Sequence, residues 1–306
     1  MKTYTLEVEE EYQGERVDRY ICDVLADFSR SYIQKLISDS MVTINDGKCK
    51  ASTKVNTDDR VVVTTPDAVI PEIVPEDIPL DILYEDDYVL VVNKPKDMVV
   101  HPAPGHYEHT LVNGIMYHCG NELSGINGVM RPGIVHRIDK DTTGSLVICK
   151  NDLAHEALAL QLKEHSIRRE YIAVVEGNID EDSGVIKKPI GRSEKDRKKM
   201  CVNAKISKPA VTHYEVLERF NGYTYIKCIL ETGRTHQIRV HMASIGHPVV
   251  GDEVYGTRKP PVVTNGQALH AYILEFVHPK TGEMVKTIAP IPDYFEKLLK
   301  LLKSKS

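Results

Sequence analysis

Residues 136–144 read His-Arg-Ile-Asp-Lys-Asp-Thr-Thr-Gly and lead into the apolar run of residues 146–149, and the interpretation of the chain depends on this stretch. Asp is unfavourable in strands and adds nothing to a core, so an Asp just before a buried strand serves either a turn or a chemical reaction. The last four residues of the stretch are typical of a polar turn. A turn leaves Arg137 and Asp139 unexplained, because side chains two residues apart point the same way on an extended chain.

Four blocks of sequence resemble the RluA/RluD-type pseudouridine synthases, which isomerise uridine in ribosomal or transfer RNA. The first block is residues 82–102, which include Val-Val-Asn-Lys-Pro at 91–95. The second is His-Arg-Ile-Asp at 136–139, the third is Arg-Glu-Tyr at 169–171, and the last is Glu-Thr-Gly-Arg-Thr-His-Gln-Ile-Arg-Val-His at 231–241. Four blocks in the family's order carry far more weight than a single Arg-x-Asp would, and the resemblance extends from about residue 80 onward.

The chain after residue 80 contains recurring short runs of β-type residues, several of them too close together to enclose a crossover helix. Strands joined by such short connections pair antiparallel. Residues 152–164 and 292–303 have the apolar spacing of helices. We therefore expect an α+β fold with a mostly antiparallel central sheet and flanking helices, which is also what the resemblance implies. The expected strands are residues 89–93, 146–150, 171–175, 211–217, 223–230, 269–277 and 284–288.

The first 65 residues predict a separate small domain. Residues 16–26 have helical spacing, Ser29 is a favourable N-cap for a second helix, and Val-Thr-Ile at 42–44 followed by Asn-Asp-Gly predicts a hairpin. This order of elements resembles the S-four RNA-binding domain, named for a small-subunit ribosomal protein, in which Arg30 and Lys35 would contact RNA. The alternative is a plain αβ mini-domain.

Residues 66–80 are expected to form a linker. The segment 66–87 contains four prolines and eight acidic residues but no Lys or Arg, which excludes a regular helix and favours a stiff, extended chain that RNA would repel. The expected organisation is therefore an RNA-binding domain at 1–65, a linker at 66–80 and a catalytic domain at 81–306.

The charge of the chain is unevenly distributed. The net charge is −5, yet residues 187–208 carry nine Lys or Arg against Glu194 and Asp196, so this window is +7 and the remainder is −12. A basic run in an otherwise acidic chain favours contact with an RNA backbone over a merely solvated loop. The expected RNA contacts in this run are Lys195, Arg197, Lys198 and Lys199.

The composition places the chain among globular proteins, with 42% hydrophobic and 27% charged residues. Six cysteines without a Cys-x-x-Cys pair favour reduced thiols in a cytoplasm over a disulfide or zinc framework. Residues 1–12 are acidic and alternating, unlike a signal peptide, and no apolar run reaches the ~18 residues of a membrane span. We expect a cytoplasmic monomer without membrane association.

The resemblance implies a reaction that breaks the N1–C1′ glycosidic bond of uridine, turns the uracil and rejoins it through C5. In the family the nucleophile is the aspartate that matches Asp139, and it could attack C1′ of the ribose or C6 of the uracil. The resemblance also implies that Arg239 is the ionic partner of Asp139 and that Ile238 packs against the base. Tyr171 would stack on the uracil or act as a base, and Arg137 would fill the space left by an extruded uridine.

Each of these residues also has a purely structural interpretation. Tyr171 suits a core aromatic, Arg239 a surface position on an amphipathic segment, and Arg137 an exposed loop. The matching sequence around them favours the functional interpretation.

Two other functions fit parts of the sequence. The first is a non-catalytic RNA-binding or folding factor, which would have no need of Asp139, Tyr171 and Arg239 together. The second is a metal-dependent RNA phosphodiesterase with Mg²⁺ at Asp139 and Asp141, although we expect no metal, and the histidines near Cys119 match no zinc spacing. The isomerisation needs no redox change or group donor, so we also expect no cofactor. The expected partner is RNA, with large-subunit (23S-type) ribosomal RNA favoured over transfer RNA.

Overall fold

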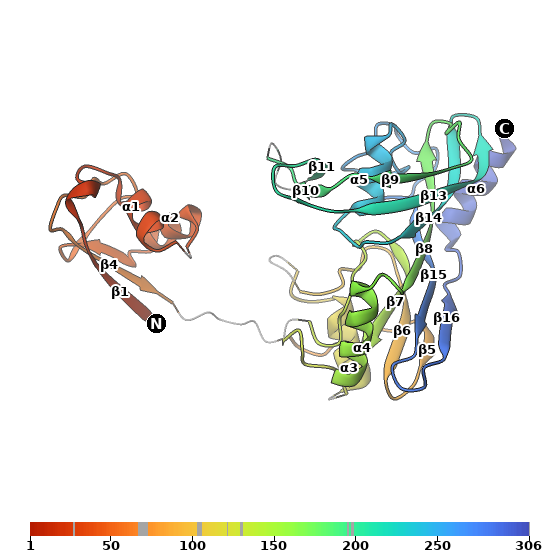
Figure 1. Cartoon of the computed structure of the whole chain (residues 1–306), viewed down its shortest axis with the longest axis horizontal. Helices are drawn as coiled ribbons and strands as arrows, with labels where there is room; N and C mark the ends of the chain where they lie inside the picture. Colours follow the sequence, from red (N-terminus) through yellow and green to blue (C-terminus); the bar gives the residue numbers. More distant parts are fainter. Residues whose placement is uncertain are drawn as a thin grey trace. The chain divides into compact units, whose positions relative to one another are not determined.

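Two large β-sheets organise the chain, one with four strands near its N-terminus and one with nine strands in the remainder (Figure 1). The chain divides into two compact units, Met1–Pro71 and Glu72–Ser306, each with its own hydrophobic core. None of the helices in the described residues is long and apolar enough to cross a membrane. The computed structural model describes residues 1–26, 28–66, 73–102, 106–120, 122–128, 131–194, 196 and 199–305.

The first unit packs two helices, α1 (Val17–Val24) and α2 (Arg30–Ser38), against its sheet. Ser29 caps α2, because its hydroxyl accepts a hydrogen bond of 3.3 Å from the backbone N–H of Tyr32. The strands pair antiparallel in the order β1-β4-β2-β3, and β1 was not predicted from the sequence. The remaining elements are β1 (Lys2–Glu7), the 3-10 helix η1 (Glu10–Tyr12), β2 (Val42–Ile44), β3 (Gly47–Lys48) and β4 (Arg60–Thr65).

The second unit is built on one large sheet in the order β5-β6-β7-β15-β8-β14-β13-β9, with β16 paired to β15. The pairs are antiparallel except that of β7 with β15, so the predicted α+β class with a mostly antiparallel sheet is confirmed. A smaller sheet has the order β11-β10-β12. The elements are β5 (Ile82–Glu85), β6 (Val89–Lys94), α3 (Leu111–Cys119), β7 (Thr143–Cys149), α4 (Asp152–Lys163), β8 (Arg168–Glu176), β9 (Ser183–Lys187), β10 (Ile190–Arg192), β11 (Met200–Val202), β12 (Ser207–Lys208), β13 (Val211–Phe220), β14 (Tyr223–Leu230), α5 (Gln237–Ser244), β15 (Leu269–Val277), β16 (Met284–Ile288) and α6 (Asp293–Ser304).

Strand β7 lies inside the large sheet and is buried on both faces, which explains the continuous apolar run that follows Asp139. Leu146 and Ile148 belong to one core, which also contains residues of α3 and α6. Val147 and Cys149 belong to the other core, which contains residues of α4, because successive side chains of a strand point to opposite faces. Burial of each aliphatic side chain contributes about 1.5–3 kcal/mol, so the loop ahead of β7 is firmly anchored at its C-terminal end.

The described part of the predicted linker, residues 73–80, packs against α3 of the second unit. Ile73 is buried in the main core, and the Asn113 side chain donates a hydrogen bond of 2.9 Å to the carbonyl of Val74. The Asn113 carbonyl in turn accepts a hydrogen bond of 3.0 Å from the Glu76 N–H. The second unit therefore begins before residue 81, where the sequence analysis placed its start, because apolar residues between the prolines have a core to bury against.

Candidate active site

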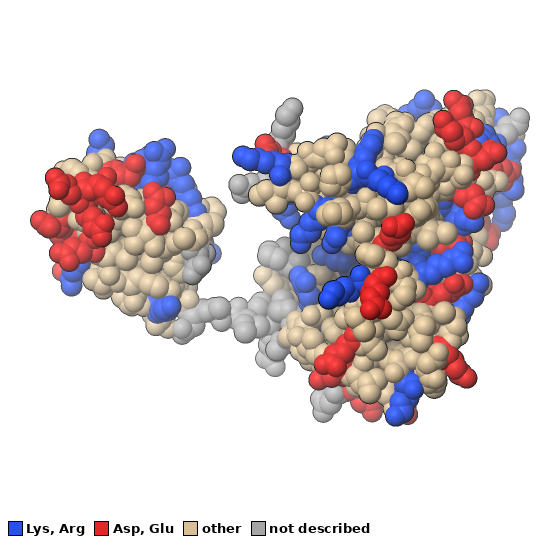
Figure 2. Space-filling model, in the orientation of Figure 1, with Lys and Arg blue, Asp and Glu red and all other residues tan. Residues whose placement is uncertain are grey.

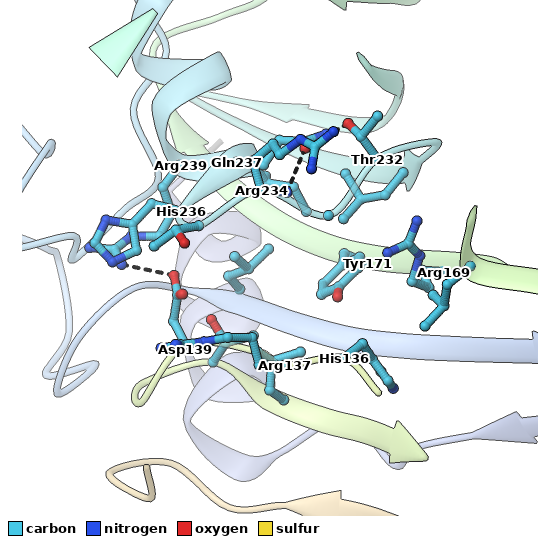
Figure 3. Close-up of a pocket in the computed structure, with 18 of the residues that line it drawn as sticks. His136, Arg137, Asp139, Arg169, Tyr171, Thr232, Arg234, His236, Gln237 and Arg239 are labelled. Atoms are coloured by element: carbon cyan, nitrogen blue, oxygen red, sulfur yellow. Dashed lines mark hydrogen bonds and ion pairs between the residues drawn. The ribbon is translucent and has the colours of Figure 1, made fainter. Parts of the chain in front are cut away.

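A cavity of about 550 Å³ lies in the second unit where several segments of the chain meet. Its main walls are the loop ahead of β7, the start of β8, and the segment that leads from β14 into α5. Figure 3 shows residues of the loop ahead of β7 on one side, residues of the β14–α5 segment on the other, and Tyr171 between them. The cavity thus brings together three of the four sequence blocks that the sequence analysis identified.

Asp139 lies on the side of the cavity formed by the loop ahead of β7. The chain turns sharply at this point, because the Thr142 N–H donates a hydrogen bond of 3.0 Å to the backbone carbonyl of Asp139. Oδ2 of Asp139 accepts a hydrogen bond of 2.9 Å from Nη1 of Arg239. Oδ1 accepts no hydrogen bond from the residues that the structure describes, so this oxygen remains available to a ligand in the cavity.

Arg239 is held from behind by Asp252, a residue that the sequence analysis did not identify. The Nε and Nη2 atoms of Arg239 donate hydrogen bonds of 2.6 and 2.9 Å to the two carboxylate oxygens of the buried Asp252. Burial would lower the pKa of Arg239, but the hydrogen bond and charge of Asp252 and the charge of Asp139 together raise it above its ordinary value. The guanidinium therefore keeps its charge and presents one edge to Asp139.

A network of polar side chains fixes the start of α5, the helix that carries Arg239. Oε1 of Gln237 accepts hydrogen bonds from the Thr232 hydroxyl at 2.8 Å and the Arg234 N–H at 2.9 Å. Nε2 of Gln237 donates a hydrogen bond of 2.9 Å to the carbonyl of Val211 in β13. His236 precedes the helix with a φ of 56°, in the left-handed region, which turns the chain sharply into α5. The start of the helix that carries Arg239 is therefore fixed by bonds to strand β13 and to the segment that follows β14.

Tyr171 and Ile238 supply the apolar lining of the cavity that faces these charges. Both side chains are buried, and Tyr171 lies on β8 between the two walls (Figure 3). Burial raises the pKa of Tyr171 to about 12, against the lowering effect of the Arg169 charge and with a smaller raising effect of Asp139. The phenol is therefore protonated at neutral pH, and its ring is available for packing against a planar base.

His136 anchors the loop that carries Arg137 and Asp139. Its Nε2 accepts a hydrogen bond of 3.1 Å from the backbone N–H of Val147 in β7, which requires the neutral ring. Burial and the nearby Arg169 lower the pKa of His136 to about 3, so the ring stays neutral. Arg137 is exposed and lines the cavity, while its neighbour Ile138 is buried. His136 belongs to the motif at 136–139, but this anchoring contact was not predicted from the sequence.

The cavity is strongly positive. Asp139 is the only carboxylate among the described residues that line it. Figure 2 shows Lys and Arg side chains gathered around the hollow between the part of the second unit that holds β10, β11 and α5 and the part that holds α3 and α4. A positive, partly enclosed site attracts a polyanion and repels a metal ion. The cationic lining residues are Arg137, Lys163, Arg169, Arg234 and Arg239.

Comparison with known proteins agrees with this geometry. A family model described as RNA pseudouridylate synthase matches residues 88–244, which include Asp139, Tyr171 and Arg239. The chain belongs to the RNA pseudouridylate synthase family. Members of this family are isomerases that convert uridine in RNA to pseudouridine, and the predicted resemblance and enzyme class are thereby confirmed.

Individual relatives cover nearly the whole chain. The chain is 52% identical over 303 residues to the "Uncharacterized RNA pseudouridine synthase YlyB" of Bacillus subtilis, with 99% of each chain covered. It is 44% identical over 312 residues to the "Ribosomal large subunit pseudouridine synthase D" of Zymomonas mobilis, with 99% of this chain and 98% of the relative covered. The solved structure of "Human RNA Pseudouridylate Synthase Domain Containing 1" has a TM-score of 0.56 and 27% identity, and the match covers 75% of this chain and 96% of that one.

Three other residues predicted to bind RNA in this pseudouridylate synthase, Arg30, Lys35 and Lys199, are described by the structure and are not among the residues that line the cavity. Arg30 lies on α2 of the first unit, where it forms an ion pair of 3.0 Å with the buried Asp18. Lys35 is exposed on the same helix. Lys199 is exposed between β10 and β11, and its backbone N–H donates a hydrogen bond of 2.9 Å to the carbonyl of Asp196. The remaining predicted contacts, Lys195, Arg197 and Lys198, lie outside the described residues.

The described residues of this synthase contain no group of three or more His, Cys, Asp or Glu side chains placed to hold a metal ion. Asp141, which the sequence analysis considered with Asp139 as a magnesium site, is not among the described residues that line the cavity. The charges that act on Asp141 are those of Lys140, Lys96, Asp97 and Lys94.

Proposed function

We propose that this chain converts specific uridines of large-subunit ribosomal RNA to pseudouridine, with Asp139 as the nucleophile. The observation that carries the proposal is the pairing of Asp139 with Arg239 inside a cationic cavity. The choice of RNA is supported by the relative from Zymomonas mobilis, whose name specifies the ribosomal large subunit and which is similar over almost its full length. The relatives from Haemophilus influenzae and Pseudomonas aeruginosa carry the same name at 42% and 43% identity.

The environment of Asp139 suits a nucleophilic carboxylate. A nucleophile must be ionised, whereas burial against an RNA substrate disfavours the charged form. The guanidinium of Arg239 opposes this effect through its hydrogen bond of 2.9 Å to Oδ2. We assign Oδ1 as the attacking atom, because Oδ2 is already bound to Arg239 and Oδ1 is available to the substrate.

Every bond and proton of the proposed reaction is accounted for by the substrate and the side chains of this cavity. Attack by Asp139 at C1′ displaces uracil through the N1–C1′ bond, whereas attack at C6 forms a covalent adduct to the base before that bond breaks. On either route C5 then bonds to C1′, the proton on C5 is lost, N1 gains a proton and the carboxylate is released. No electron is exchanged with an external group, so we propose a reaction without a cofactor.

We assign Tyr171 a stacking role against the uracil, with Ile238 packing on the same base. A phenol whose pKa is raised to about 12 gives up its proton reluctantly, which disfavours proton abstraction as its main task. The target nucleotide must leave its helix to reach Asp139, and enzymes that react with a base take it out of the stack. The exposed Arg137, two residues before the nucleophile, is suited to occupy the vacated space.

We further propose that RNA docking is distributed beyond the cavity. The unit Met1–Pro71 would bind RNA through the helix that carries Arg30 and Lys35, and the basic run at 187–208 would contact the backbone. A single chain supplies Asp139, Tyr171 and Arg239 to the cavity, and we propose that a monomer is active. Its site of action would be the cytoplasm, where bacterial relatives meet their ribosomal RNA.

The proposal is tested by mapping pseudouridine in large-subunit RNA from cells with and without this protein. We expect a small set of uridines to lose modification when the protein is absent and to regain it when the parent chain, but not Asp139→Asn, is restored. Unchanged large-subunit RNA together with lost modification in transfer RNA would contradict the proposed substrate.

A further inference from the structure

Arg169 is a buried cation in the cavity wall that has no acidic partner among the residues the structure describes. The residue is only 6% exposed, and its Nη2 donates one hydrogen bond of 2.9 Å to the backbone carbonyl of Glu231. Its Nε is buried and donates to no partner, and the residue forms no ion pair with any of the described residues. A buried charge without a counter-charge is rare, because its lost hydration is not replaced.

The neighbouring arginine on the same strand shows the usual arrangement. Arg168 points to the opposite face of β8 and is 46% exposed at its side chain. It pairs with Glu170 at 2.7 Å and with Glu275 at 3.7 Å. The better hydrated of the two guanidinium groups thus pairs with two carboxylates, whereas the buried one pairs with none in the described part of the chain.

Arg169 does not become neutral by losing a proton. Burial lowers the pKa of Arg169 from its ordinary value, but a guanidinium remains protonated in proteins. The cost of burial must therefore be offset by something that the folded chain alone does not provide. A buried polar group in this condition calls for a specific explanation, and a bound anion in the cavity would supply both the counter-charge and the missing hydrogen bonds.

Local packing keeps this guanidinium at the cavity. Gly233 lies beside the guanidinium and leaves space for it, because a Cβ atom at position 233 would come within 2.7 Å of Nη1 of Arg169. Figure 3 shows Arg169 beyond Tyr171 as seen from Asp139, with Arg234 and Thr232 across the cavity. Residues 169 and 171 are two positions apart on a strand, a separation of roughly 6.6 Å. That is comparable to the distance between a base and the phosphate of its own nucleotide.

We propose that Arg169 is a phosphate-binding residue, which takes the backbone phosphodiester next to the uridine that stacks on Tyr171. The inference rests on the proposed entry of RNA into this cavity and adds a defined anion subsite to it. A phosphodiester supplies the missing counter-charge, and arginine binds phosphate oxygens with two parallel N–H groups. Lys163 and Arg234 line the same cavity and add to the attraction. The subsite would hold the RNA backbone in place while the detached uracil rotates beside Asp139.

The experiment measures coupling between Arg169 and a single phosphate. The probe is a short single-stranded RNA with one central uridine, prepared with a neutral methylphosphonate at one linkage at a time. The nucleotide before that linkage carries a 2′-O-methyl group in every version, so that the modified backbone is stable. Affinity is measured for the parent, for Arg169→Met, and for Arg168→Met as the matched control that removes the neighbouring charge on the other face of β8.

We expect one linkage beside the uridine at which the neutral group weakens binding to the parent and to Arg168→Met about tenfold but leaves binding to Arg169→Met unchanged. The salt dependence of affinity should also fall by roughly 0.7 in logarithmic slope for Arg169→Met alone. A purely structural role predicts a less stable variant, whereas phosphate binding predicts that Arg169→Met without RNA unfolds at the same temperature as the parent or higher. If Arg169→Met does not fold, Arg169→Gln, which can still donate to the Glu231 carbonyl, replaces it in every measurement.

The proposal would be overturned if the methylphosphonate lowered RNA affinity equally for the parent and for Arg169→Met at every linkage. That result would point instead to a contact between Arg169 and the uracil carbonyl groups. The proposal would also be overturned if Arg168→Met behaved like Arg169→Met, since the effect would then be general electrostatics. Absence of RNA binding by the parent would contradict the proposed function itself, and the subsite with it. Binding and conversion by the parent without coupling would contradict the subsite alone.

Discussion

Asp252 orients Arg239 through two hydrogen bonds of 2.6 and 2.9 Å, which leaves only the Nη1 edge of the guanidinium to meet Asp139. Asp252 is itself fixed, because its Oδ1 accepts hydrogen bonds from the backbone N–H groups of Val254 and Tyr255 at 2.9 and 3.1 Å. The ring of Tyr255 covers the guanidinium, with the Cζ atom of Arg239 5.2 Å from the ring centroid. The charge beside Asp139 is therefore held in place before any substrate arrives.

Asp252→Asn should slow pseudouridine formation without abolishing RNA binding. The amide cannot accept both guanidinium bonds, so Arg239 gains freedom to turn away from Asp139. We expect the single-turnover rate at saturating enzyme to fall about ten- to hundredfold, which corresponds to a barrier increase of ~1.4–2.7 kcal/mol. The control is Asp182→Asn, which removes an exposed carboxylate from Arg219 and should leave the rate unchanged. A parental rate in Asp252→Asn would contradict the positioning role.

Tyr171→Phe distinguishes stacking from proton transfer. The variant keeps the ring and loses the hydroxyl, so a stacking residue should retain conversion within about tenfold of the parent. Tyr171→Leu, which removes the ring, should weaken RNA binding by ~1–3 kcal/mol of stacking energy. Single-turnover rates and affinities for both variants check this prediction. A loss of about 10²–10⁴-fold in Tyr171→Phe would instead identify the hydroxyl as a general acid or base.

Neutralising the basic run should affect affinity and not chemistry. Replacing Lys195, Arg197, Lys198 and Lys199 with Ala removes four possible phosphate contacts, so the slope of log affinity against log salt should fall by roughly 3. The rate at saturating enzyme should be unchanged. A variant with four exposed lysines replaced elsewhere is the control: Lys280, Lys297, Lys300 and Lys305. An unchanged slope would show that the run is only solvated surface.

The free energy of unfolding of the second unit should decrease as the pH falls below ~6.5, the ordinary pKa of a histidine. His270 is buried on β15 opposite Thr143 of β7, its Nδ1 bonds the Thr143 hydroxyl at 2.8 Å, and burial lowers its pKa to about 4. Between its unfolded pKa of ~6.5 and a folded pKa of about 4, the unfolded chain binds a proton at this site that the folded chain does not. The free energy of unfolding therefore decreases as pH falls through this window and is fully retained above it.

His270→Gln isolates this contribution, because glutamine does not titrate. We expect its unfolding free energy to depend less on pH between 6.5 and 4 than that of the parent, by up to ~1.4 kcal/mol per pH unit. Urea unfolding at a series of pH values provides the measurement, with His213→Gln, an exposed ring paired with Glu231, as the control. Identical pH profiles for the parent and His270→Gln would contradict the prediction.

The elements predicted most accurately are those that depend on local sequence patterns, such as alternation, turn residues and helix caps. Strands β14, β15 and β16 begin and end where alternation and turn residues placed them, and Ser29 caps α2 as predicted. Helix α5 was not predicted, because Gln237 to Met242 are all buried and leave no amphipathic stripe. The polar members of that run bond to segments distant in the sequence, as when Gln237 donates to the carbonyl of Val211.

Only those residues of the candidate site that lie in a recognisable sequence motif were predicted. Asp139, Tyr171 and Arg239 were named from matching blocks, and the structure brings all three to one cavity. Asp252 and Arg169 were not assigned a role, because their importance depends on which charges lie beside them after folding. Partners from distant segments, and the absence of a partner, are properties of the tertiary structure that local spacing does not encode.

The most direct test of the proposed mechanism is the single-turnover rate of pseudouridine formation by Asp139→Asn on a large-subunit RNA that the parent converts. The amide keeps nearly the same shape and can still contact Arg239, but it has no negative charge with which to attack carbon. We expect the rate to fall at least ~10³-fold, a barrier increase of ~4 kcal/mol, while RNA affinity and unfolding temperature stay near those of the parent. Conversion by Asp139→Asn within about tenfold of the parental rate would show that Asp139 is not the nucleophile.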